Sequence, residues 1–147
     1  MIASVQGILL AEDNANDVEL TLQALRGYRV VNDIIVVRDG VEALDYLYRR
    51  RRFVERSPEN PGLMLLDLKM PKIDGLEVLR QVKGDTDLRT IPVVVLTSSR
   101  EEQDLLRSYD LGVNAYVVKP VNFPDFMEAV KLLGGFWAVI NEPPPSR

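Results

Sequence analysis

Five polar residues each stand where an apolar run of the chain stops. They are Glu12, Asp13, Asp67, Thr97 and Lys119. Carboxylates that meet repel one another unless a cation lies between them. A hydroxyl and an ammonium beside such a cation are groups that bind the oxygens of a transferred phosphoryl group. Cation binding and phosphoryl chemistry are therefore what these residue types can do, if the fold brings them together.

Asp67 follows an unbroken apolar run. Leu63 to Leu66 contains no polar residue, is entered from Pro61-Gly62 and is followed by Pro71, which predicts a short strand buried on both faces. A carboxylate at the end of such a strand needs a cation or a chemical role to offset its desolvation. The alternative is an aspartate that caps the next turn.

The rest of the chain alternates predicted strands and helices. Strands are expected at Ile8–Ala11, Asp33–Val37, Leu63–Asp67, Ile91–Leu96 and Ala115–Val118. Helices are expected from Asn14 or Asn16 to Gly27, from Val41 into Arg49–Arg52, from Asp74-Gly75 to Gly84, at Glu101–Leu111 and from Phe123 to about Ile140. Five such units predict an α/β fold of the flavodoxin-like (βα)5 type, a three-layer sandwich with parallel strand order 2-1-3-4-5.

Composition limits the classes of function. The chain has 147 residues, 46% of them hydrophobic, which predicts one domain over 1–140 and a Pro-rich extended tail over 141–147. A net charge of −4 argues against a nucleic-acid partner. The absence of cysteine and histidine excludes disulfides, thiolate or imidazole ligands and a phosphohistidine on this chain. With no predicted membrane span or signal peptide, we expect a cytoplasmic protein without membrane contact.

The predicted strand order brings the carboxylates together. Strands 1 and 3 are neighbours in the 2-1-3-4-5 order, so Glu12 and Asp13 converge on Asp67 at one edge of the sheet. A cluster of oxygen ligands favours a hard cation. Mg²⁺ fits best, because it needs one or two carboxylates and keeps waters for a phosphate. The backbone carbonyl of Lys69 is a further candidate ligand.

These motifs resemble the receiver domain of two-component response regulators. The resemblance covers Ile8 to Ile140 and rests on Glu12-Asp13, Asp67-x-x-Met70-Pro71-x-x-Asp74-Gly75, Thr97 and Lys119-Pro120. It implies that Asp67 accepts a phosphoryl group from a partner histidine kinase and that Glu12, Asp13, Asp67 and the Lys69 carbonyl hold Mg²⁺. It further implies that Thr97 and Lys119 bind the phosphoryl oxygens, that Tyr116 is an aromatic switch and that the Lys119-Pro120 bond is cis. Such a protein is a phosphoacceptor rather than a classical enzyme.

A finer resemblance is to single-domain regulators that serve phytochrome-type histidine kinases. It rests on Glu12-Asp13-Asn14, Asp39-Gly40-x-Glu42-Ala43-Leu44-x-Tyr46-Leu47, a long insert before the third strand, Phe136-Trp137 and Asn141-Glu142-Pro143. The downstream protein partner is not specified by the sequence.

Two rival functions use similar parts. A phosphohydrolase of the haloacid dehalogenase type needs a second aspartate two residues after its nucleophile, where this chain has Lys69. A flavin- or nucleotide-binding module needs a loop that binds phosphate after the first strand. Here that loop, Glu12 to Asp17, is acidic and repels phosphate in the absence of a metal.

The last predicted helix carries more apolar residues than one buried stripe requires. They are Phe126, Met127, Val130, Leu133, Phe136, Trp137 and Ile140. We therefore expect a homodimer through the fourth helix, fifth strand and fifth helix, the alternative being a monomer in which these side chains fold back onto the sheet. The run Arg49–Arg52 is expected to be a solvated helix end, with an acidic partner as the alternative.

Overall fold

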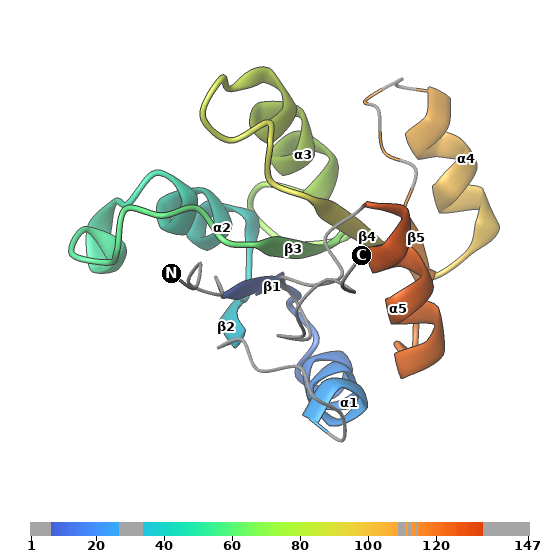
Figure 1. The fold of residues 1–147 in the computed structure, drawn as a ribbon. Helices are drawn as coiled ribbons and strands as arrows, with labels where there is room; N and C mark the ends of the chain where they lie inside the picture. Colours follow the sequence, from blue (N-terminus) through green and yellow to red (C-terminus); the bar gives the residue numbers. More distant parts are fainter. Residues whose placement is uncertain (1–6, 27–33, 109–110, 112, 114, 134–147) are drawn as a thin grey trace, which may run out of the picture.

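A parallel sheet between two layers of helices forms the framework (Figure 1). The computed structural model describes residues 7–26, 34–108, 111, 113 and 115–133. The sheet has the order β2-β1-β3-β4-β5, which confirms the predicted flavodoxin-like topology. Its strands are β1 (Ile8–Ala11), β2 (Ile34–Val37), β3 (Leu63–Asp67), β4 (Val93–Thr97) and β5 (Tyr116–Val118). The helices are α1 (Ala15–Arg26), α2 (Gly40–Leu47), the 3₁₀ turn η1 (Arg51–Phe53), α3 (Gly75–Gly84), α4 (Arg100–Ser108) and α5 (Phe123–Leu132).

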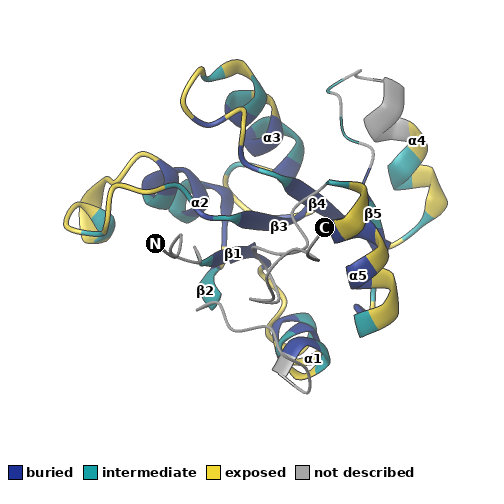
Figure 2. Ribbon diagram, in the orientation of Figure 1, coloured by how far each residue is buried: buried dark blue, intermediate teal, exposed yellow. Residues whose placement is uncertain are grey.

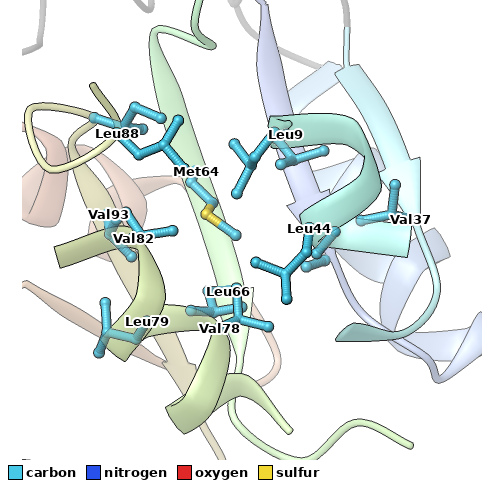
Figure 3. Close-up of a cluster of buried hydrophobic side chains, with 14 of the residues drawn as sticks. Leu9, Val37, Leu44, Met64, Leu66, Val78, Leu79, Val82, Leu88 and Val93 are labelled. Atoms are coloured by element: carbon cyan, nitrogen blue, oxygen red, sulfur yellow. The ribbon is translucent and has the colours of Figure 1, made fainter. Parts of the chain in front are cut away.

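Alternating strand residues bury their side chains in two separate cores. On one face, Leu9 and Leu66 pack with side chains of α2 and α3 such as Leu44 and Val78, as Figure 3 shows around Met64. On the other face the neighbouring residues, Leu10 and Leu65 among them, pack with α1 and α5. Since successive side chains of a strand point to opposite faces, a strand covered on both faces must be apolar throughout. The central strands are accordingly buried along their whole length (Figure 2).

Several predicted boundaries differ from the structure at the ends of elements. β4 begins at Val93, because the N–H of Ile91 donates to Leu88 O in a turn and Pro92 has no N–H to give to a ladder. β5 begins at Tyr116, and α4 ends at Ser108. α5 ends at Leu132; its predicted continuation to Ile140, the residues Phe136 and Trp137 and the tail 141–147 lie outside the described residues.

The prediction that the second helix runs into Arg49–Arg52 is wrong. The helix ends because Arg49 adopts a left-handed backbone with φ of 56°, and the N–H groups of Arg49 and Arg50 donate to Tyr46 O and Asp45 O. This is the usual hydrogen-bond pattern of a helix end, in which glycine normally supplies the left-handed residue.

The arginines after this helix end form ion pairs with carboxylates of α2. Arg50 Nε lies 3.3 Å and Arg51 Nη1 2.7 Å from Oδ1 of the buried Asp45. Arg52 pairs with Glu42 and lies over the ring of Phe53. The segment thus follows the helix rather than ending it, and its arginine side chains are 52% to 70% exposed, as a solvated segment requires, while they pair with carboxylates.

Candidate functional site

The carboxylates of Glu12, Asp13 and Asp67 meet at the carboxyl edge of the sheet. Ala11 and Leu66 are partners in the β1–β3 register, so the residues that follow them lie side by side. One oxygen from each of the three side chains lies within 4.8 Å of the others. The sequence prediction that these three residues converge is thus confirmed in its geometry.

Burial makes the charges in this cluster costly. Glu12 is fully buried, and this burial, together with the neighbouring charge of Asp67, raises its pKa to about 7. Burial also raises the pKa of Asp67, although Lys119 and a hydrogen bond from the Lys69 backbone oppose the change. Positive charge placed beside these two buried carboxylates therefore stabilises their ionised forms.

Lys119 brings a positive charge into the cluster from the end of β5. Its Nζ lies 3.2 Å from Glu12 Oε1 and 3.4 Å from Asp67 Oδ1. The peptide bond to Pro120 is cis, as the resemblance to receiver domains implies. Lys119 therefore supplies the positive charge that contacts Glu12 and Asp67, and the predicted convergence of its ammonium on these carboxylates is confirmed.

Asp17 also contacts Lys119, and this contact was not predicted from the sequence. Its Oδ2 lies 3.1 Å from Lys119 Nζ. Asn14 caps α1 by accepting the Asp17 N–H at 2.9 Å, which places Asp17 in the first helical turn, at the same edge as the carboxylates. The sequence did contain a signal for this position: Asp17 is a carboxylate three residues after the cap Asn14, in the acidic segment that begins with Glu12-Asp13.

The backbone after Asp67 is packed too tightly for a side chain at Gly75. The Gly75 N–H donates to Leu68 O at 2.8 Å, and a Cβ at Gly75 would lie 2.1 Å from Asp67 O. The start of α3, capped by Asp74, is thereby held against the residues that carry Asp67. Glycine is required here because of this close approach.

Thr97 and Tyr116 lie on the two strands beyond β3, and Tyr116 is in register with Val95, two residues before Thr97. Thr97 ends β4 and is fully buried, and its hydroxyl oxygen accepts a hydrogen bond from Gln103 Nε2 of α4 at 3.4 Å. The Tyr116 hydroxyl donates to Val113 O at 2.9 Å. The contact with Gln103, which links Thr97 to α4, was not predicted from the sequence.

A second link to α4 runs through Glu102. Its carboxylate lies 3.1 Å from Lys69 Nζ and accepts the N–H and the hydroxyl of Ser98. Burial acts to raise the pKa of Glu102, but the hydrogen bonds from Ser98 and Lys69 outweigh it and keep that pKa below its usual range. The loops that follow β3 and β4 are joined by this carboxylate.

The donor set fits a divalent cation. Glu12, Asp13 and Asp67 offer only carboxylate oxygens, and Lys119 beside them is a point charge that a phosphoryl oxygen can approach. Hard oxygen ligands of this kind suit Mg²⁺ or Mn²⁺. The arrangement can hold a metal ion next to a carboxylate that ends a buried strand.

Comparison with known sequences gives the family. The family model of the response regulator receiver domain matches residues 8–131. The chain belongs to the response regulator receiver family. This receiver domain is 42% identical over 130 residues to the response regulator Rcp1 of Synechocystis, a match that covers 88% of this chain and 87% of that protein.

Solved structures agree with this assignment. The bacteriophytochrome response regulator AtBRR is 58% identical, with a TM-score of 0.90 and coverage of 95% of this receiver domain and 100% of that chain. The Mn²⁺-bound form of Rcp1 is 38% identical, with a TM-score of 0.73 and coverage of 96% and 99%. This receiver domain is therefore a two-component response regulator, and the hydrolase and flavin alternatives are not favoured. Among the described residues, no helix is long and apolar enough to cross a membrane.

Proposed function

We propose that Asp67 is the phosphoacceptor of this response regulator. A carboxylate oxygen of Asp67 attacks the phosphorus of a phosphohistidine on the partner kinase, the P–O bond forms as the P–N bond breaks, and the histidine leaves with the bonding electrons. The observation that carries the proposal is the position of Asp67, which ends β3 within 3.4 Å of Lys119 Nζ and beside two further carboxylates.

We assign the metal to Mg²⁺, held by Glu12, Asp13, Asp67 and the backbone carbonyl of Lys69. Bound there, Mg²⁺ neutralises charge on the phosphoryl oxygens. The ammonium of Lys119 binds a second phosphoryl oxygen, and the buried hydroxyl of Thr97 binds a third after it turns away from Gln103. Tyr116 then changes its position, and the surface formed by α4, β5 and α5 changes with it.

The partner is a histidine kinase of the phytochrome type, which the similarity to a bacteriophytochrome response regulator supports. The downstream partner is a protein, because the net charge of −4 does not favour nucleic acid. We also propose a homodimer through α4, β5 and α5. Its support in the described residues is the exposure of Val118 (45%) and Leu132 (70%), whereas Phe126, Met127 and Val130 are buried against the sheet.

Phosphate uptake tests the proposed acceptor. Wild type and Asp67→Asn are incubated with acetyl phosphate and Mg²⁺, and intact masses are measured with and without EDTA. Wild type should gain one phosphoryl group with Mg²⁺ and lose this gain in EDTA, while Asp67→Asn should gain none. Equal uptake by both proteins refutes Asp67 as the acceptor.

A further inference from the structure

The ammonium of Lys119 is shared among three carboxylates, and one of them lies outside the metal ligands. Glu12 and Asp67 belong to the proposed metal site, whereas Asp17 does not. The Nζ–O distance to Asp17, 3.1 Å, is slightly shorter than the distances to Glu12 and Asp67, 3.2 and 3.4 Å. Asp17 is therefore a separate anchor for the same positive charge.

A metal ion and the ammonium compete for the same oxygens. A divalent cation between Glu12, Asp13 and Asp67 repels a positive charge only a few ångströms away. When the metal binds, the contacts of Lys119 with Glu12 and Asp67 weaken, and the contact with Asp17 is the one that the metal does not contest. Without Asp17, the ammonium would stay on Glu12 and Asp67, and its positive charge would weaken the binding of the metal ion.

The structure around Asp17 suits it to this role. Its backbone N–H donates to Asn14 Oδ1, which holds the backbone of Asp17 in the first turn of α1. The side chain of Asp17 is 26% exposed and that of Lys119 is 15% exposed, so both partners of the contact are partly buried. The hydrogen bond to Asp17 and the charges of Asp67 and Glu12 also outweigh burial and hold the pKa of Lys119 above its ordinary value, so the group stays positively charged.

We propose that Asp17 is a positioning residue for Lys119, drawing its ammonium away from Glu12 and Asp67 so that a divalent cation can bind between them. The proposal rests on the proposed function, because it takes these carboxylates as metal ligands. Asp17, in the first turn of α1, would thus strengthen metal binding without contacting the metal ion.

Calorimetric titration with MgCl₂ provides the test. Asp17→Asn should weaken Mg²⁺ binding about fivefold, which is the scale of coupling between residues in one charged network. Asp17→Glu, which can still reach the ammonium, should restore most of the affinity. The matched control is Glu19→Gln: Glu19 is an exposed carboxylate of the same helix that accepts from Gln23, so its removal changes the net charge by the same amount. It should change the affinity less than about twofold.

A double-mutant cycle with Lys119→Gln separates positioning from simple charge removal. In the Lys119→Gln background, Asp17→Asn should change the Mg²⁺ affinity less than about twofold. An equal loss in both backgrounds, or no loss in the wild-type background, overturns the positioning role. If Asp13→Ala binds Mg²⁺ as tightly as wild type, the proposed metal site itself fails, and the positioning role fails with it. Circular dichroism melting of each variant confirms that the comparison is made between folded proteins.

Discussion

Asp45 and Asp67 are both buried carboxylates, and they differ in the charges that surround them. Asp45 receives two guanidinium groups, from Arg50 and Arg51, at 3.3 and 2.7 Å. Asp67 receives one ammonium, from Lys119 at 3.4 Å, which Glu12 and Asp17 share. The first region has more positive than negative charge, and the second has more negative than positive charge.

This difference distinguishes a structural ion pair from a site that takes up cations. Near Asp45, the guanidinium of Arg56 holds the loop further. It lies over the ring of Tyr46 and donates to the backbone carbonyls of Tyr46 and Leu47. Around Asp67 burial works against the charges that are present, and the pKa of Glu12 rises accordingly. Such an arrangement favours the uptake of positive charge, as a proton on Glu12 or as a bound cation.

The largest expected effect is the loss of stability in Asp45→Asn. The substitution leaves the shape nearly unchanged but removes the charge that Arg50 and Arg51 contact, and it should lower the free energy of unfolding by about 2 kcal/mol. Urea denaturation measures this value. Glu77→Gln, which removes an exposed pair with Arg80, is the control and should change the stability by less than about 0.5 kcal/mol. Equal losses in the two variants would remove the contrast between the regions.

The next largest effect is a gain in stability on removing the charge of Glu12, and it depends on pH. Because the pKa of Glu12 is about 7 in the folded protein and has its ordinary value of 4.5 in the unfolded chain, the folded state binds a proton more tightly. Without metal, the stability should be greatest below the unfolded value and should fall as pH rises through about 7.

Glu12→Gln tests this dependence. In EDTA at pH 8 it should stabilise the protein, on the order of 1 kcal/mol, and it should flatten the change in stability between pH 5 and pH 8. Thermal melting at several pH values gives both results. A stability that rises with pH over this range in wild type would contradict the assignment of excess negative charge to this edge.

The smallest expected effect is local. Phosphorylation should change amide exchange in the segment from Thr97 at the end of β4 to Glu102 in the first turn of α4, because the Thr97 hydroxyl leaves Gln103. The segment Arg49–Arg56 should stay unchanged. Thr97→Ala should still take up phosphate yet lose this response. Hydrogen exchange followed by mass spectrometry compares the two segments within one protein. The same change in wild type and Thr97→Ala would show that the hydroxyl does not carry the signal.

Much of the fold could be predicted from the sequence, because its strongest signals are local. Leu63 to Leu66 has no polar residue, and a strand covered on both faces needs that pattern. Asp74 before Gly75 marks a helix start, and the structure shows the Asp74 side chain capping α3. The strand order then followed from five successive βα units, and with it the convergence of Glu12 and Asp67.

The errors come from contacts between residues that are far apart or from unusual backbone. The end of α2 was misplaced because Arg49, where glycine is usual, takes the left-handed position, and the pairing of Arg50 and Arg51 with Asp45 accompanies this turn. Asp17 was overlooked because its partner, Lys119, follows it by 102 residues. Gln103 was overlooked for a similar reason, since its bond to Thr97 depends on how α4 lies against β4.

The position of the phosphoryl group tests the central claim most directly. After treatment with acetyl phosphate and Mg²⁺, borohydride reduces an aspartyl phosphate to homoserine, and tandem mass spectrometry locates the altered residue. We predict the change at Asp67 alone, with Asp45, an equally buried carboxylate, unaltered in the same sample. Homoserine at Asp13, Asp17 or Asp45, or none at Asp67 while the intact protein gains phosphate, would contradict the account.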